Sequence, residues 1–315
     1  MNMPPETGVR AAAAALVLIF ALIPTLGLQE YWIYILTIGF FYAVLASSWS
    51  LLVGYVGRIS FAHAAMAGLG AYTSAMASTR LGLPLYASIP LAALVVGCVG
   101  LFLGRICLKL HGAYLGLTTI AFSEIFRIAV TAEHGFTRGS LGLQAPGFFA
   151  TNGRAQYYYL FFIFLLCVLG TMWLLLRSRI GLYFAAIRED EDAAASLGVH
   201  VVRWKVMAFA ISSMIAGLAG AFYAHFVQLV APSMMSLQEM GLILSMAVIG
   251  GFQNIFFAAI GGVFLEVLLE LMREIGGWRM TIFGLAVMVV LRYAPNGLVG
   301  ELIRISYRHV RGWVT

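Results

Sequence analysis

Ten apolar stretches, most of them about 20 residues long, follow one another along this chain with short polar segments between them. A helix that crosses the hydrocarbon core of a bilayer needs about 20 apolar residues, so each stretch is a candidate membrane span. The predicted spans cover residues 10–28, 32–53, 60–78, 86–104, 113–131, 157–176, 205–227, 238–252, 255–274 and 279–293. The eighth and tenth are short enough to be re-entrant or broken, so the prediction is about ten crossings within a range of nine to eleven.

Composition favours an all-α polytopic membrane protein, with residues 1–315 as a single transmembrane domain. Charged residues are 10% of the chain, apolar residues are 62%, and the mean hydropathy is +0.95, whereas soluble domains carry about 25% charged residues. The 34 glycines lie among alanine-rich stretches, where small residues let membrane helices approach closely. The predicted close-packing pairs are Gly100 with Gly104, Gly112 with Gly116, and Ala216 with Gly220.

The basic residues indicate how the spans are oriented. With the amino terminus inside, thirteen of the 19 Lys and Arg residues fall on the inner side and five on the outer side, with Arg127 within a span. Under the positive-inside rule both termini are cytoplasmic, residues 132–156 form an extracytoplasmic loop and residues 177–204 a cytoplasmic one. The net charge of +6 is therefore interpreted as an orientation signal, with no nucleic-acid partner.

The chain's only two aspartates lie close together in the 177–204 loop. Asp190 and Asp192, with the neighbouring glutamates, place acid in the predicted first turn of a helix of two to three turns, and Gly198 stands where a C-terminal cap belongs. So short a helix is marginal unless it packs against something. Periodicity alone leaves two interpretations equal, a helix that docks on a partner and a solvated loop helix.

Charged side chains within the predicted spans are costly and need partners. Glu124 and Arg127 are spaced for an intrahelical ion pair, and Glu270 can pair with Arg273, which leaves Glu266 less explained. A structural role is favoured, with a proton relay as the alternative.

The stretch over residues 54–74 is too polar and too rich in glycine for a lipid-facing helix. Ser60, His63 and Tyr72 must face protein or water, and Gly68 and Gly70 permit either close packing or a helix break that exposes backbone to a cavity. The alternative is a small-residue packing face in which a carbonyl group satisfies His63.

Several enzyme classes lack their residues here. The only lysines, Lys109 and Lys205, lie outside any GxxxxGK[ST] phosphate loop, no GxSxG motif occurs, and the six histidines are never spaced as HxxH or HxxxH. We therefore expect no enzyme activity in this chain, no metal and no bound cofactor.

Taken together, several motifs resemble one family, the LivM-type permease subunits of branched-chain amino acid ABC importers. The motifs are SFAHAAMAGLGAY from Ser60, GAYLGLTTIAFSEIFR from Gly112, TRGSLGL from Thr137, AIREDEDAAASLGV from Ala186, and APNGLVG from Ala294. They occur in order between about residues 35 and 300, and their joint occurrence is more specific than any one of them.

The resemblance implies an importer permease that works by alternating access in the bacterial inner membrane. Its partners would be a homologous LivH-like permease, two ABC ATPases that bind ATP-Mg, an extracytoplasmic solute-binding protein and the lipid bilayer. In such permeases a cytoplasmic helix with the motif E-A-A-x-x-x-G docks on the ATPase, and here Asp192, Ala193, Ala194 and Gly198 match it, with aspartate in place of glutamate. The expected coupling residues are Arg188, Glu189, Asp190, Glu191, Asp192, Ala193, Ala194, Leu197 and Gly198. The expected pathway residues are Ser60, His63, Gly68, Gly70, Tyr72, Thr119 and Glu124.

Two departures from the family pattern leave the substrate open. Ala62 stands where relatives usually carry glycine, and Arg58 stands where glutamine is common, so urea, short amides and aromatic acids remain alternatives to branched-chain amino acids. Two other functions also remain. One is an ion-coupled secondary transporter using the intramembrane glutamates, and the other is a membrane-embedded enzyme with His63 or His225 at its centre.

Overall fold

The computed structural model of the chain describes residues 15, 17–107, 113–149, 153–294, 297, 298, 300 and 301. Nearly all of this part is helical. Its elements are η1 (Ile23–Leu26), α2 (Glu30–Val56), α3 (His63–Arg80), α4 (Leu85–Cys107), α5 (Ala113–Ala132), η2 (Gly139–Leu141), β1 (Leu143–Gln144), α6 (Arg154–Arg177), α7 (Arg179–Glu189), α8 (Glu191–Ser196), α9 (Val201–Val227), β2 (Leu229–Val230), η3 (Pro232–Met235), α10 (Leu237–Gly250), α11 (Ile255–Leu271), η4 (Met272–Ile275) and α12 (Trp278–Tyr293).

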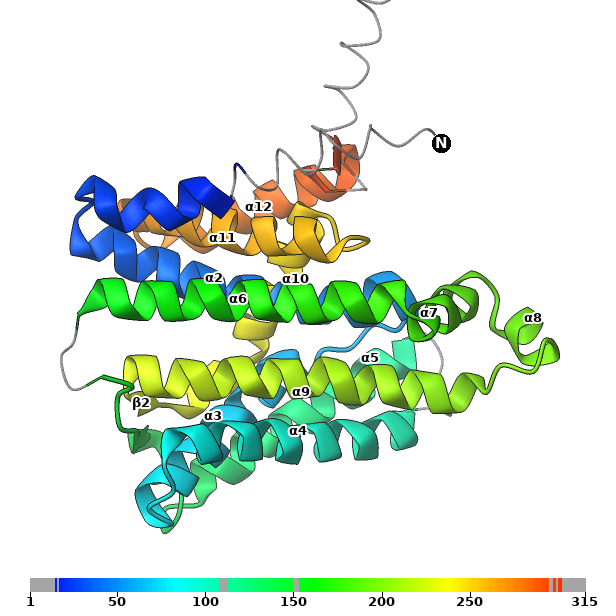
Figure 1. Cartoon of the computed structure of the whole chain (residues 1–315), viewed down its shortest axis with the longest axis horizontal. Helices are drawn as coiled ribbons and strands as arrows, with labels where there is room; N and C mark the ends of the chain where they lie inside the picture. The colour runs from blue at the N-terminus through cyan, green and yellow to red at the C-terminus, as the bar shows by residue number, and fades with distance from the viewer. Residues whose placement is uncertain are drawn as a thin grey trace, which may run out of the picture.

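The long helices form a bundle around α2. Helix α9 packs most extensively against α4 and α3, and α2 packs against α11, α6 and α9 (Figure 1). The helices differ in how deeply they are buried. Within the most apolar 18-residue window of each helix, 83% of the residues of α2 are buried but only 22% of those of α5. Helix α2 is therefore the central element, and α5 lies at the periphery of this chain.

The described part of each of the ten predicted spans contains a helix, but the helices differ in length, and residues 10–14 and 16 of the first span lie outside the described residues. Six are long and apolar enough to cross a membrane, namely Glu30–Val56, Leu85–Ile106, Tyr114–Ala132, Arg154–Arg177, Val201–Val227 and Ile255–Ile275. Val17–Leu26 and α10 are shorter apolar helices, and α12 has 16 residues. The eighth and tenth spans are thus short, as predicted. The chain is a polytopic helical protein, and both of its termini lie outside the described residues.

The third predicted span is a helix over only part of its length. Helix α2 ends at Val56 with Gly57 in the left-handed region at φ 74°, residues 57–62 are not helical, and α3 begins at His63. No break occurs at Gly68 or Gly70, because α3 runs unbroken to Arg80. Of the two roles the sequence allowed for these glycines, the structure shows close packing.

Small residues permit the closest helix crossings. A Cβ atom on Gly220 of α9 would collide with the backbone of Ala67 in α3, and one on Gly70 would collide with the backbone of Gly217. Gly100 of α4 lies against α9 in the same way, where an added Cβ would be 2.6 Å from that of Ser213. Packing between backbones is a main source of helix association in lipid. An added Cβ on Gly104 would lie 3.1 Å from that of Phe209 in α9, and one on Gly116 would lie 3.1 Å from the ring of Phe61, whereas Gly112 lies outside the described residues.

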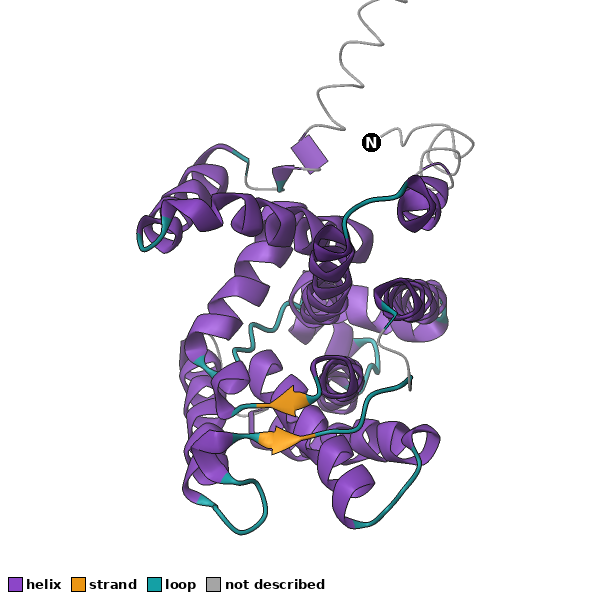
Figure 2. Cartoon of the chain, turned by 90° about the vertical axis from the view of Figure 1, so that its left-hand side faces the viewer, coloured by secondary structure: helices purple, strands orange, loops and turns teal. Residues whose placement is uncertain are grey.

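A two-stranded sheet is the one departure from the all-α prediction within the described ranges. Strands β1 and β2 pair antiparallel, with Leu143 opposite Val230, and join the loop after α5 to the segment after α9 (Figure 2). This sheet lies at one end of the bundle, whereas α7 and α8 lie at the other (Figure 1). The loops over residues 132–156 and 177–204 are therefore at opposite ends.

Candidate functional site

The predicted coupling segment consists of two helices that meet at Asp190. This residue is extended, at φ −157° and ψ 114°, and its Oδ1 accepts hydrogen bonds from the amides of Asp192 at 2.9 Å and Ala193 at 3.0 Å. An aspartate side chain that caps these amides ends one helix and begins the next. The prediction that Glu189 lies in the first turn of the acidic helix is corrected, because Glu189 is the last residue of α7.

The other end of α8 is the predicted glycine cap. Gly198 has φ 86°, and the amide of Val199 donates to the carbonyl oxygen of Ala194 at 3.1 Å. This pattern closes a short helix with a residue in the left-handed region, which glycine adopts without steric cost. The C-terminal boundary read from the sequence is confirmed.

Glu191 points into the protein and joins α8 to two other parts of the chain. Its Oε2 accepts from both Arg58, in the linker before α3, and Lys205, in the first turn of α9. Lys205 is buried, so this carboxylate supplies the counter-charge that a buried ammonium requires. Burial of Glu191 raises its pKa, but the hydrogen bond from Lys205 and the charge of Arg58 outweigh that effect and hold the pKa below its usual value.

The remaining residues of the segment divide between an inner and an outer side. Ala194 is buried, and Arg188 donates to the backbone carbonyl of Gly54 at the end of α2. Asp192, Ala193 and Leu197 are exposed, with Leu197 at 84%. The segment thus presents an acidic and partly apolar outer side while its inner side is fixed to α2, α9 and the linker at residues 57–62.

The structure buries six of the seven predicted pathway residues, whereas the side chain of Glu124 on the peripheral helix α5 is 44% exposed. Ser60, His63, Tyr72 and Thr119 are each at most 2% exposed. Thr119 Oγ1 accepts from the amide of Phe61 at 3.0 Å, and the carbonyl oxygen of Ser60 accepts from the indole of Trp49 at 2.8 Å. These bonds position the non-helical linker, whose backbone groups have no helix to satisfy them.

The two buried histidines make hydrogen bonds to other interior groups. His63 Nε2 lies 2.6 Å from Ser212 Oγ, whereas its Nδ1 is buried with no hydrogen-bond partner in the described part of the chain. His225 lies 2.8 Å from Ser74 Oγ and 2.8 Å from the carbonyl oxygen of Pro146. A hydroxyl, and not the expected carbonyl, is the hydrogen-bond partner of His63, and it reaches only Nε2.

Two of the intramembrane carboxylates have the arginine partners predicted from their spacing. Glu124 accepts from Arg127, with Nε to Oε2 at 3.0 Å, and Glu270 lies 3.1 Å from Arg273. Both ion pairs are local to one helix and its end.

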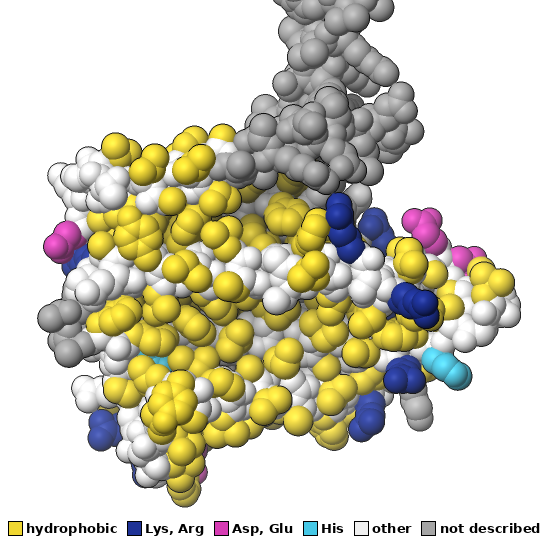
Figure 3. All heavy atoms as spheres, in the orientation of Figure 1, with side chains coloured by type: hydrophobic (Ala, Val, Ile, Leu, Met, Phe, Trp, Pro, Cys, Tyr) yellow, Lys and Arg dark blue, Asp and Glu magenta, His cyan; other side chains and the backbone are white. Residues whose placement is uncertain are grey.

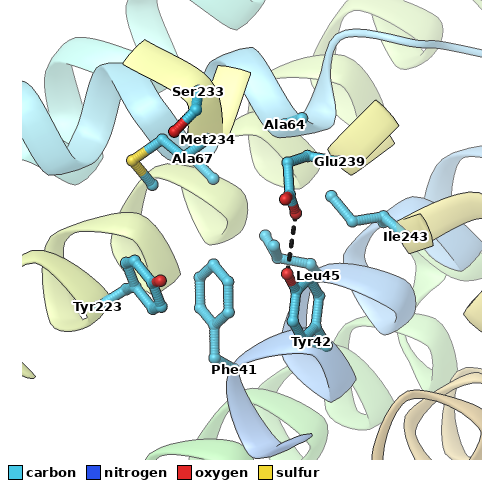
Figure 4. Close-up of a pocket in the computed structure, with 10 residues that line it drawn as sticks. All are labelled: Phe41, Tyr42, Leu45, Ala64, Ala67, Tyr223, Ser233, Met234, Glu239 and Ile243. Carbon is cyan, nitrogen blue, oxygen red and sulfur yellow. Dashed lines mark hydrogen bonds between the residues drawn. The ribbon is translucent and has the colours of Figure 1, made fainter. Parts of the chain in front are cut away.

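An interior cavity of about 100 Å³ lies elsewhere, between α2, α3, α9, η3 and α10 (Figure 4). Its lining comprises Phe41, Tyr42, Leu45, Ala64, Ala67, Tyr223, Ser233, Met234, Glu239 and Ile243. None of the seven predicted pathway residues is among them. Glu239 is the one acidic side chain in the lining, and sequence reasoning missed it although it falls in the predicted span 238–252, where a charged residue is itself a signal.

These features define the class of protein. Apolar side chains cover much of the face seen in Figure 3, and lysine, arginine and acidic side chains gather toward its two ends. With six helices that can span a bilayer and short helices between them, the chain is a multi-pass membrane protein.

Comparison with known proteins gives the family. The sequence profile of the branched-chain amino acid transport system permease component matches residues 31–293, and the chain belongs to that family. It is 30% identical to the high-affinity branched-chain amino acid transport system permease protein LivM of Salmonella typhimurium and 29% identical to that of Escherichia coli, in both cases over 84% of this chain and 69% of the relative. It is also 24% identical to the LivH permease protein of Escherichia coli, over 84% of this chain and 93% of the relative. No solved structure matches.

Proposed function

We propose that this chain is a permease subunit of an ATP-driven importer and forms half of a translocation pathway for branched-chain amino acids or a related small solute. The match to the permease family over residues 31–293 carries this proposal. The pathway would operate by alternating access, in which the two permeases rock between outward-open and inward-open states.

The proposed orientation has ten crossings, with both termini in the cytoplasm. The helices found in the described part of every predicted span support the count. The placement of Arg177, Arg179, Arg188 and Arg203 in or beside α7, α8 and the start of α9 supports a cytoplasmic location for that end, since cytoplasmic loops are enriched in basic residues. The loop over residues 132–156 would then be extracytoplasmic, and the protein would lie in a bacterial inner membrane.

The segment over residues 188–198 is the proposed contact with the ATPase. Its exposed outer side offers Asp192, Ala193 and Leu197 to a partner, and its inner side is tied through Glu191 to Arg58 and Lys205. A shift of α8 would therefore displace the N-terminal end of α9 and the linker that leads into α3. ATP-Mg would be bound and hydrolysed by the partner, and this chain would contribute movement alone.

The predicted pathway residues act in this proposal mainly on the shape of the pathway. Ser60 and Thr119 hold the linker at residues 57–62, Gly68 and Gly70 bring α3 against η3 and α9, and Tyr72 donates to the carbonyl oxygen of Val230 at 3.2 Å. His63 and Glu124 complete the set. Each residue would hold neighbouring helices together so that they move as one rigid body.

The proposed assembly contains a homologous LivH-like permease, two ATPases and an extracytoplasmic solute-binding protein. Similarity of this one chain to both LivM and LivH proteins supports a pair of related permeases. Gentle purification of the chain from its native membrane, followed by mass spectrometry of what co-purifies, tests this composition. A second multi-pass permease and a Walker-motif ATPase are expected, and a chain that is stable alone, with neither partner, would contradict the proposal.

A further inference from the structure

The side chain of Glu239 is partly buried and has no cationic partner among the described residues. Its side chain accepts one hydrogen bond, from the Tyr42 hydroxyl at 2.8 Å, and no ion pair joins it to any residue that the structure describes. Glu124 and Glu270 each have an arginine, and Glu266 on α11, which likewise lacks an ion pair in the described ranges, does not line the cavity. A carboxylate within a membrane protein normally has a partner, and the Glu239 carboxylate lines a cavity in place of one.

The side chains around this carboxylate are suited to binding a primary ammonium group. The rings of Phe41 and Tyr223 stack with centroids 4.5 Å apart, and Tyr42 lies beside Phe41 at 5.2 Å. Figure 4 shows these rings and the Glu239 carboxylate around one space. Aromatic faces and a carboxylate together favour an organic cation. A metal ion is a poorer fit, since no group of three or more His, Cys, Asp or Glu side chains comes together in the described part of the chain.

The rest of the lining is apolar. Leu45 and Ile243 are buried beside Glu239, and Met234 closes the opposite side (Figure 4). A volume of about 100 Å³ holds roughly three water molecules, which suffices for an ammonium group and its first carbons. The cavity reaches Ser233, which is exposed, so a longer substrate would extend past it toward the surface.

We infer that this cavity is the subsite for the substrate's ammonium group, with Glu239 as the counter-charge and Tyr42 and Tyr223 as its hydroxyl and aromatic contacts. The inference rests on the proposed importer function and narrows its substrate class. Zwitterionic amino acids with a short apolar side chain fit such a subsite. Urea, neutral amides and aromatic acids, which lack the ammonium group, do not.

The test uses the whole complex, reconstituted in vesicles with its ATPases, second permease and saturating binding protein, and L-leucine as the probe. Glu239→Gln keeps the side-chain volume and an acceptor for Tyr42 but removes the charge. Since a hydrogen bond to a charged group corresponds to roughly 10- to 100-fold in binding, uptake of subsaturating leucine is expected to fall at least tenfold. Tyr42→Phe should give a smaller loss, and assembly with the partners should be unchanged in both.

Glu30→Gln is the matched control. Glu30 is the first residue of α2 and does not line the cavity, and its carboxylate lies 3.6 Å from Arg154. Because an exposed ion pair contributes little, leucine uptake in this variant should stay within about twofold of the wild-type value. Wild-type leucine uptake in Glu239→Gln would overturn the ammonium subsite. Efficient uptake of urea or a neutral amide by the wild-type complex would also overturn the ammonium subsite. A loss of uptake in Glu239→Gln that is confined to proton-driven uptake would overturn it as well. A wild-type complex that shows no ATP-driven uptake would instead count against the proposed function itself.

Discussion

At the scale of single residues, local rules explain the ends of α8 but not its attachments. Asp190 caps the amides two and three residues ahead, and Gly198 ends the helix in a left-handed conformation. Both effects depend on neighbouring residues, so the sequence predicts them. The pairing of Glu191 with Arg58 joins residues 133 positions apart, and one sequence contains no signal for such a contact.

Gly220 is the residue at which a small change should matter most for stability. In Gly220→Val the new side chain would collide with the backbone of Ala67, so α9 and α3 must separate. Overpacking costs about 1–3 kcal/mol, and more where backbone must move. Thermal unfolding of the purified protein in detergent should show a lower Tm.

Gly170→Val provides the control for that substitution. A Cβ at Gly170, on α6, meets no atom of the described structure within 4 Å, so its Tm should remain close to that of the wild type. Equal Tm values for the two variants would show that the α3–α9 crossing does not depend on glycine.

At the scale of elements, the sequence locates the helices but not their interruptions. Apolar stretches place all ten spans, because burial in lipid demands a run of apolar residues. They do not show that α3 begins only at His63 or that α7 and α8 are separate. These breaks depend on a hydrogen bond that Trp49 donates and on others that Thr119 and Asp190 accept. The cavity was missed for a related reason, because its lining comes from five elements.

The inner attachment of α8 can be tested apart from transport. Glu191→Gln leaves the buried ammonium of Lys205 without a carboxylate, so α8 should separate from α9 more often. Amide hydrogen exchange over residues 191–199 is then expected to quicken several-fold. Asp192→Asn, which alters an exposed side chain on the same helix, should leave exchange unchanged, and equal protection in all three proteins would show that Glu191 does not hold α8.

The outer side of α8 should govern coupling to the ATPase. Asp192→Lys reverses the charge on the exposed side, and although a single exposed pair contributes only about 0–1 kcal/mol, such charges set the register of docking. We expect ATP-driven uptake to fall several-fold at normal expression. Glu274→Lys makes the same reversal on η4, away from α8, and should have little effect. Normal transport in Asp192→Lys would refute the coupling role.

At the scale of the whole molecule, the chain has the architecture of one half of a transport pathway. Its central helix, α2, packs against α11, α9 and α6 and contributes three cavity residues, and η3 carries the exposed rim at Ser233. The family and the general fold could be predicted from ordered motifs and apolar runs. The substrate contacts could not, because they arise only when distant helices are brought together.

Transport by this chain is proposed to be driven by ATP. The direct measurement is uptake of L-leucine into vesicles that contain the purified native complex, with loaded binding protein outside, ATP-Mg inside, and ionophores to collapse ion gradients. We expect uptake that requires ATP and continues with the ionophores present. Uptake that proceeds without ATP and stops when the ion gradient collapses would contradict this proposal and would identify an ion-coupled carrier.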